Sequence, residues 1–173
     1  MREYLDNLYT ENRKVTYTGS DVIKLDTKCL YAGKLERIKK WSEKSHEHPF
    51  CEILFVFSGS GKTVIEGKVY PITKGDIIIY NPNTKHEEST SAEIGLEMGF
   101  FGITNFKISD FPSNYLISPE SEPVIHSGND EYKIAFYFMQ LIEEIRGEEK
   151  YNELIAKYLA RLILIDILRL ANI

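Results

Sequence analysis

The sequence predicts an α+β domain that is mainly β, with its strands first and two helices last. Up to about residue 126, short runs of branched and aromatic residues alternate with turn residues, as in a β-sandwich or a small barrel. After "SGND" at 127–130, the apolar residues recur with the helical period. With 173 residues, 43% of them hydrophobic and 27% charged, the chain is long enough to bury the core of one globular domain.

Five β-rich runs make up the first part of the chain, at 28–41, 51–59, 63–72, 74–86 and 92–103. Glu66 and Gly67 interrupt the third run and predict a hairpin in which Gly67 adopts a positive φ. An Asn-Pro-Asn sequence at 81–83 predicts a turn at the end of the fourth strand. The glycines of the last run indicate bulges or a close approach of two backbones.

The stretch "SGSGKT" at 58–63 resembles the end of a phosphate-binding P-loop, but two features exclude that function. The first glycine of a P-loop would stand at position 56, which is Val56. A P-loop must also open a helix, whereas the residues that follow predict a hairpin. We therefore interpret this stretch as a Gly/Ser-rich turn that joins two strands.

Two helices are predicted at the end of the chain. Asp130 can cap a helix that Gly147 closes, and a second helix runs from about Tyr151 to Leu170. The second helix is apolar on more than one face, so one side can pack on the strands while another needs a further partner. A second subunit is the simplest partner, and a missing part of a longer chain is the alternative. The residues expected at this dimer interface are Leu154, Tyr158, Leu162, Ile165 and Leu168.

Charge and composition exclude several classes of protein. The net charge is −5 and no basic patch stands out, so this chain alone should be a poor DNA binder. It has no apolar run of the roughly 18 residues that a membrane span needs. The polar N-terminus shows no signal peptide, so the cytoplasm is the expected compartment. Cys29 and Cys51 have neither metal-site spacing nor a disulfide framework.

A group of histidines carries the chemistry that is visible in the sequence. His46, His48 and Glu52 lie at i, i+2 and i+6, so an extended segment would place all three on one face. His86 follows the Asn-Pro-Asn turn and can supply a fourth ligand from another strand. Imidazole and carboxylate together suit one divalent transition metal, such as Zn, Ni, Fe or Mn. The alternative is a metal-free polar patch whose groups satisfy one another or orient a ligand. The remaining histidine, His126, is expected on the surface.

These residues resemble the two cupin motifs. "HEHPFCEILFVFSG" is similar to the first motif through Gly59, and Gly75 precedes His86 by the eleven residues typical of the second. The sequence departs from the cupin pattern at Lys40, Pro82, Thr84 and Thr90. Together with "VYPITKGDIIIYNPNTKH" and the helices that follow, the chain resembles the N-terminal sensor domain of AraC-family transcription regulators over about residues 20–170.

The resemblance implies a double-stranded β-helix, or cupin jelly-roll barrel, over 15–128, followed by a helical dimerisation segment at 129–173. It implies a non-catalytic domain that binds a small effector such as a sugar or a small aromatic compound, forms a homodimer and requires no cofactor. DNA would be bound through a C-terminal helix-turn-helix domain that this chain does not include. The alternative is a stand-alone metal-dependent cupin enzyme, such as a dioxygenase, isomerase or epimerase, with the metal on the same four ligands.

The effector is expected inside the barrel, where small barrels hold one ligand. By alternation along the strand, Phe50, Leu54 and Val56 share the face of Glu52. The residues expected to contact the ligand are His46, His48, Glu52, His86, Phe50, Leu54, Val56, Trp41, Tyr31 and Tyr80. Residues 1–14 form an N-terminal arm that could fold over the pocket as a lid or could equally be disordered.

Overall fold

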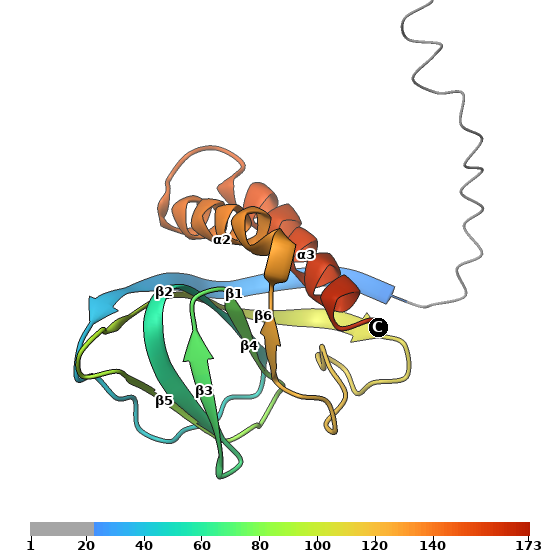
Figure 1. Ribbon diagram of the computed structural model, residues 1–173. Coiled ribbons are helices and arrows are strands. Elements are labelled where there is room, and N and C mark those ends of the chain that lie inside the picture. Colours follow the sequence, from blue (N-terminus) through green and yellow to red (C-terminus); the bar gives the residue numbers. More distant parts are fainter. Residues whose placement is uncertain (1–22) are drawn as a thin grey trace, which may run out of the picture.

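The computed structural model describes residues 23–173, and strands precede helices as predicted (Figure 1). The strands are β1 (Ile23–Ile38), β2 (Cys51–Ile65), β3 (Lys68–Thr73), β4 (Asp76–Tyr80), β5 (His86–Thr90), β6 (Leu96–Ile108) and β7 (Val124–His126). The helices are η1 (Gly128–Asp130), α2 (Glu131–Arg146) and α3 (Asn152–Leu170). The N-terminal arm at 1–14, and with it the expected lid, lies outside the described residues.

The strand pairings are antiparallel, and β2 belongs to two sheets. Its first half lies between β6 and β4 in a sheet of order β1-β6-β2-β4-β7. Its second half pairs with β3 along one edge and with β5 along the other. The sheets curl toward each other beneath the helices (Figure 1). This is the jelly-roll barrel that the sequence predicts.

The course of β2 corrects the turn predicted at 58–63. The strand is continuous from Cys51 to Ile65, and this stretch pairs with β3 and β5. Gly59 allows β2 to pass from one sheet to the other, because its φ is +86° and a Cβ there would lie 2.1 Å from the carbonyl oxygen of Gly95. The exclusion of a P-loop is confirmed, since the Gly-Lys-Thr sequence lies within a strand and opens no helix.

The predicted hairpin is confirmed, but two short strands are not predicted by the sequence. Glu66 and Gly67 both have positive φ, and Ile65 pairs with Lys68 across the turn. β5 has the polar sequence His-Glu-Glu-Ser-Thr, and it is a strand because it pairs with β2. β7 has three residues and pairs with β4. Both depend on long-range pairing that a local pattern does not reveal.

The two long helices lie over the face of the sheet that contains β1 and β6 (Figure 1). α2 begins directly after Asp130, as predicted, and ends at Arg146 just before Gly147. The side chain of Asp130 makes no capping hydrogen bond, and its carboxylate pairs with Lys133 at 2.8 Å instead. α3 has nearly the predicted bounds.

Alternation along β2 divides the core into two layers. Ile53 points toward the helices, where it belongs to the same cluster as Phe138 of α2. Leu54 and Val56 point the other way, into the barrel, where they pack with Met98. The neighbouring residues of one strand therefore serve two separate cores, as the period of two requires. The inner layer bounds the space available to a ligand.

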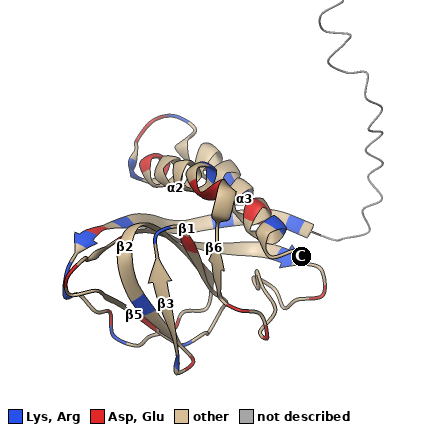
Figure 2. Ribbon diagram, viewed as in Figure 1, with Lys and Arg blue, Asp and Glu red and all other residues tan. Residues whose placement is uncertain are grey.

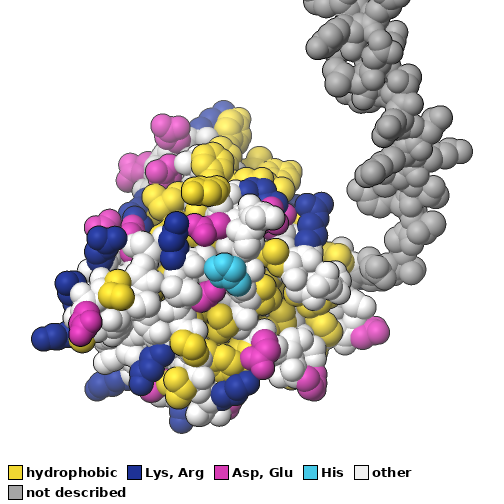
Figure 3. Space-filling model, in the orientation of Figure 1, with side chains coloured by type: hydrophobic (Ala, Val, Ile, Leu, Met, Phe, Trp, Pro, Cys, Tyr) yellow, Lys and Arg dark blue, Asp and Glu magenta, His cyan; other side chains and the backbone are white. Residues whose placement is uncertain are grey.

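One row of apolar side chains on α3 is exposed. Leu154, Tyr158 and Leu162 recur every four residues and are 48%, 56% and 42% exposed. Ile165 is half-buried. Leu168 does not belong to this row, because it is 3% exposed and packs in the chain's own core, so its expected place in a dimer interface is corrected. Figure 3 shows hydrophobic side chains gathered over the helices.

Charges of both signs are interspersed over the barrel and the helices (Figure 2). His126 is on the surface, as predicted, with 60% of its side chain exposed and its Nδ1 2.9 Å from Oδ1 of Asp76. Within the part of the chain that the structure describes, no helix combines the length and the apolar character that crossing a membrane requires.

Candidate functional site

Three histidines converge in the barrel. One ring nitrogen each of His46, His48 and His86 lies within 4.8 Å of the other two. The ring centroids of His46 and His86 are 4.3 Å apart, and those of His48 and His86 are 4.9 Å apart. The predicted convergence is therefore observed, but strand alternation is not its cause. The segment before β2 is irregular, and His46 joins β5 through an isolated bridge to His86.

The segment 41–46 reaches the site because it runs antiparallel to β5. The backbone groups of His46 and His86 exchange two hydrogen bonds of 2.9 Å. The backbone N–H of Glu43 donates to the carbonyl of Glu88 at 2.9 Å. Further along, the N–H of Thr90 donates to the carbonyl of Trp41, also at 2.9 Å. These contacts hold the indole of Trp41 and the imidazole of His46 over the interior of the barrel.

Each of the three histidines is oriented by a backbone carbonyl two residues away. The distance from Nδ1 to that oxygen is 2.9 Å for His46, 2.8 Å for His48 and 2.8 Å for His86. Because a carbonyl can only accept a hydrogen bond, Nδ1 carries a proton in each ring. Nε2 is then left to face the centre of the cluster. An Nδ1–H held in this way is typical of histidines that bind a metal through Nε2.

Glu52 completes the cluster. Its Oε2 lies 3.2 Å from Nε2 of His48 and 3.7 Å from Nε2 of His86. Its Oε1 accepts a hydrogen bond of 2.5 Å from the hydroxyl of Tyr31. These two distances are close to the roughly 3.4 Å that separates two ligands of one tetrahedral ion. The group whose ligand atoms all lie within 4.8 Å of one another, however, consists of the three histidines without Glu52.

In the absence of a metal, the two groups beside His48 favour its positively charged form. Its Nδ1 faces a carbonyl and its Nε2 faces Glu52, and both of these groups are acceptors. Burial lowers the pKa of His48, but the hydrogen bond and the charge of Glu52 outweigh it and hold the pKa above its usual value. Burial likewise raises the pKa of Glu52, but the hydrogen bonds from His48 and Tyr31 outweigh it and hold the pKa below the ordinary range.

His86, in contrast to His48, is uncharged. It is 1% exposed, and burial lowers its pKa to about 4, so it is neutral near pH 7. The ring of Tyr80 stacks on it with centroids 3.8 Å apart. Among the described residues, its Nε2 is the buried side-chain nitrogen that has no hydrogen-bond partner. Such an orphaned atom costs about 1–3 kcal/mol, and its lone pair would be satisfied by a metal ion or by a donor on a ligand.

A pocket of about 350 Å³ lies beside the histidines. Its apolar and aromatic lining consists of Leu35, Trp41, Leu54, Met98 and Phe100. Its polar lining consists of Glu43, His46, Glu52 and Glu88. This volume is near the lower end of small-molecule sites, which range from about 300 to 1,000 Å³, and apolar walls with a few polar groups are their usual form.

The expected ligand-contact residues divide into two groups. Four of them line the pocket, namely Trp41, His46, Glu52 and Leu54. Most of the others lie one layer further out and support the polar residues. His48, His86 and Tyr31 contact Glu52, Phe50 stacks on His48, and Tyr80 stacks on His86. Val56 belongs to the barrel core and does not line the pocket.

Sequence reasoning missed Glu88, a buried carboxylate in the pocket that is 5% exposed. Its Oε1 accepts a hydrogen bond of 2.6 Å from the hydroxyl of Tyr80, which lies 2.8 Å from Oγ1 of Thr63. Burial raises the pKa of Glu88. A signal was present, because Glu88 stands two residues after His86 and so shares its strand face. It can be used only once β5 is recognised as a strand.

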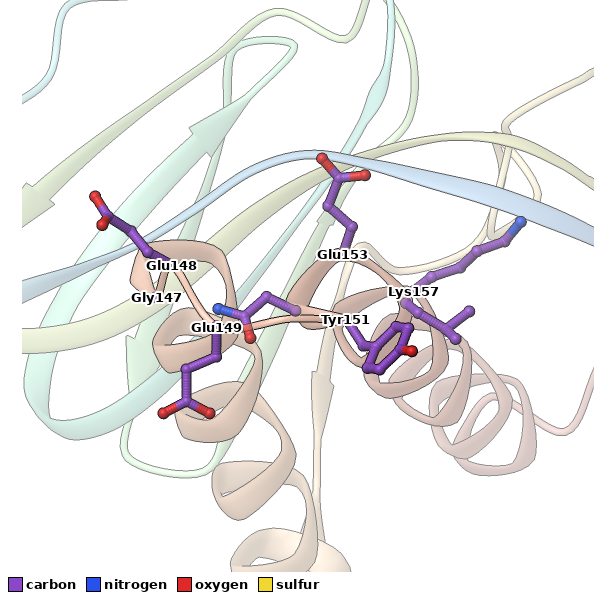
Figure 4. Close-up of a pocket in the computed structure, with 8 residues that line it drawn as sticks. Gly147, Glu148, Glu149, Tyr151, Glu153 and Lys157 are labelled. Carbon is purple, nitrogen blue, oxygen red and sulfur yellow. The ribbon is translucent and has the colours of Figure 1, made fainter.

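A second hollow, of about 610 Å³, lies at the turn between α2 and α3 (Figure 4). Its acidic residues Glu148, Glu149 and Glu153 are exposed and point away from one another. It therefore lacks the convergent, buried polar groups of the barrel pocket, and we assign it no ligand.

The barrel and its pocket define a cupin-type ligand-binding domain. The family model described as AraC-like ligand binding domain matches residues 34–164. The chain therefore belongs to this family, as the motifs around His46 and His86 predict. The match covers the strands of the barrel from β2 to β7 and most of the helical segment.

The related curated proteins are transcription activators. The HTH-type transcriptional activator RhaR of Enterobacter sp. (strain 638) is 25% identical over 124 residues, which are 69% of this chain and 44% of that protein. RhaR of Escherichia coli (strain K12) is 33% identical over 52 residues, which are 30% of this chain and 18% of that protein. The chain thus spans less than half the length of these relatives.

Solved structures match part of this chain. A predicted oxalate decarboxylase from Thermotoga maritima matches with a TM-score of 0.38 and 26% identity, over 42% of this chain and 62% of that one. A Cupin 2 conserved barrel domain protein from Salinispora arenicola CNS-205 matches with a TM-score of 0.39 and 18% identity, over 46% of this chain and 79% of that one. Such partial alignments assign no activity.

Proposed function

We propose that this chain is the effector-binding and dimerisation domain of an AraC-type transcription regulator, and that the effector binds in the barrel. The observation that carries the proposal is the pocket of about 350 Å³, with aromatic walls and a polar end that includes the buried Glu88, in a chain of the AraC-like ligand binding family. The regulator acts in the cytoplasm, and a helix-turn-helix domain outside this chain contacts DNA.

The regulator works by a shift between two states. An effector changes this equilibrium only through its different affinity for the two states. The exposed row of Leu154, Tyr158 and Leu162 supports a homodimer interface, because apolar side chains that recur on one exposed helix face are typical of protein–protein contacts. α2 and α3 pack on the sheet opposite the barrel interior, so a ligand that moves β2 or β6 can alter their position.

We propose that His46, His48, Glu52 and His86 can hold one divalent transition metal. The anchored Nδ1 atoms and the orphaned Nε2 of His86 support this set. A metal bound there would act as a Lewis acid toward an oxygen or nitrogen of the effector. Without the metal, the imidazolium of His48 balances the charge of Glu52.

The same cluster favours a second function, that of a stand-alone metal-dependent cupin enzyme such as a dioxygenase, isomerase or epimerase. The two functions differ in what happens to the bound compound. An enzyme converts it, whereas a sensor releases it unchanged.

A thermal-shift screen of sugars, small aromatic compounds and amines tests the proposal, because a ligand of the folded state raises the melting temperature. We expect at least one compound to stabilise the chain and to be recovered unchanged. Phe100→Ala, in the pocket, should weaken its binding, whereas Phe136→Ala, at an exposed position of α2, should not. A hit that binds both variants equally, or that is turned over, would contradict the proposal.

A further inference from the structure

The charged side chains that line the barrel pocket are all carboxylates among the residues that the structure describes. They are Glu43, Glu52 and Glu88, and no lysine or arginine joins them. We propose that the effector of this pocket is a small organic cation, with a protonated amino group on an apolar or aromatic body. This inference rests on the proposed function and adds the chemical class of the ligand.

Glu52 is not the acceptor that a ligand would use first. Its Oε1 accepts a hydrogen bond from the hydroxyl of Tyr31, and its Oε2 is hydrogen-bonded to Nε2 of His48. The charge of this carboxylate is balanced inside the protein, by the imidazolium of His48 or by a metal ion. The other two carboxylates form the rest of the polar end of the pocket, with His46 beside them.

Glu88 has one oxygen left for a ligand. Its Oε1 accepts a hydrogen bond from the hydroxyl of Tyr80, while no donor within the described part of the chain lies within hydrogen-bond distance of its Oε2. The side chain is only 5% exposed, so bulk water cannot solvate it fully. This oxygen keeps some contact with solvent, because it is not among the fully buried atoms without a partner, and it is free to accept a hydrogen bond from the occupant of the cavity.

Glu43 strengthens the same end of the pocket. The hydrogen bond from its backbone N–H to the carbonyl of Glu88 holds the two residues side by side, and both line the cavity. Glu43 is exposed, so water screens its repulsion of the buried Glu88, and a cation bound between the two would reduce what remains of that repulsion. A carboxylate or phosphate ligand would add to the repulsion, and a neutral sugar would leave it in place.

The rest of the pocket suits the body of such a cation. Trp41 and Phe100 offer aromatic rings, whose faces attract an ammonium group. Leu54 and Met98 provide the apolar surface for a hydrocarbon or aromatic skeleton. An ammonium group that donates to Glu88 also makes a charge-assisted hydrogen bond, which is about twice as strong as a neutral one.

The test compares ligands that share a skeleton and differ in charge. Phenethylamine, 2-phenylethanol and 3-phenylpropionate form one set, and cyclohexylethylamine with its alcohol and acid analogues forms another. Thermal shift and the fluorescence of Trp41, the one tryptophan of the chain, report binding. We expect the amines to bind more tightly than their neutral and anionic analogues, and 0.5 M salt to weaken the amines selectively.

Variants locate the ammonium group. Glu88→Gln keeps an acceptor for Tyr80 and should weaken the amines roughly tenfold while leaving the alcohols unchanged. Glu36→Gln, at an exposed position of β1 outside the pocket, is the matched control. Amine binding that is the same in wild type and Glu88→Gln would overturn the inference.

The outcomes separate this inference from the proposed function. If sugars or neutral compounds bind at Trp41 as well as the amines or better, the pocket is an effector site and the assignment of a cation is wrong. If no compound of any class alters the emission of Trp41 or the melting temperature, both proposals fail.

Discussion

Nε2 of His86 lies 3.7 Å from Oε2 of Glu52, buried and without a hydrogen-bond partner among the described residues. The imidazole of His86 is therefore neutral beside a carboxylate, and its one N–H, at Nδ1, donates to the backbone carbonyl of Thr84. Protonation of Nε2 would create a buried cation, and a metal ion would use the same lone pair. A low pH and a bound metal should therefore both change the free energy of unfolding of this domain through Nε2 of His86.

The first prediction concerns acid and the metal-free protein. Burial lowers the pKa of His86 to about 4 from the value of 6.5 expected in the unfolded chain. Between these values the unfolded chain binds a proton that the folded chain does not, so the free energy of unfolding should fall as the pH drops. The contribution of this residue amounts to about 3 kcal/mol. Urea unfolding at a series of pH values measures it.

His86→Gln removes the titrating group and should flatten the loss of stability between pH 6.5 and 4. His126→Gln, at the exposed histidine, is the control and should keep the wild-type slope. The raised pKa of His48 acts in the opposite direction, since its contribution is present at low pH and is lost as the pH rises through the folded-state value. An unchanged slope in His86→Gln would mean that His86 is not buried as a neutral ring.

The second prediction concerns metal content. Protein purified without a nickel resin should contain about one divalent transition metal per chain by plasma mass spectrometry. The His46→Ala, His86→Ala double variant should contain none, because two of the four proposed ligands are removed. Replacement of His126, which is exposed and contacts Asp76 instead of this cluster, should not change the content. A metal-free wild type that gains no stability from added Zn or Ni would remove the metal proposal.

The third prediction concerns the helical interface. Leu162→Glu should weaken a homodimer by about a hundredfold, because the dimer would bury an unpaired charge at an apolar contact. Light scattering over a concentration series measures the change. Val69→Glu introduces the same charge at a residue of β3 that is 56% exposed, and it should leave the dimer intact. A wild-type chain that is monomeric at every concentration would refute this interface.

The fourth prediction concerns the passage of β2 between the sheets. Gly59 and Gly67 both have positive φ, +86° and +80°, so alanine at either position carries the strain of a left-handed residue, about 1–2 kcal/mol. At Gly59 the new Cβ would also meet the carbonyl oxygen of Gly95 at 2.1 Å, whereas at Gly67 nothing lies within 4 Å. Chemical unfolding should show Gly59→Ala to be less stable than Gly67→Ala by at least about 2 kcal/mol. Equal losses would mean that β2 does not approach Gly95 closely.

Much of the fold follows from local patterns in the sequence. The change from strands to helices, the hairpin at Glu66 and Gly67, and the bounds of α3 all depend on neighbouring residues, and the structure confirms them. The sequence predicts the convergence of the histidines, but its cause is the backbone bridge between His46 and His86, not a common strand face. β5, and with it Glu88, depends on pairing with a distant strand, which no local pattern contains.

The errors have the same origin. The Gly/Ser-rich stretch at 58–63 has the composition of a turn, but pairing on both edges keeps it in a strand. The apolar pattern of α3 shows that more than one face is apolar, yet it does not show which residues the chain's own sheet covers. Leu168 was therefore expected in an interface, although it packs in the core.

The most direct test of the account is a fluorescence titration of Trp41, which lines the pocket and is the chain's one tryptophan. A compound that stabilises the domain in the thermal-shift screen is added stepwise to wild type and to Phe100→Ala. We expect a saturable change in the emission of Trp41. In wild type it should give the same Kd as calorimetry, and in Phe100→Ala the Kd should be larger. A compound that binds by calorimetry without any change in the emission of Trp41 would contradict it.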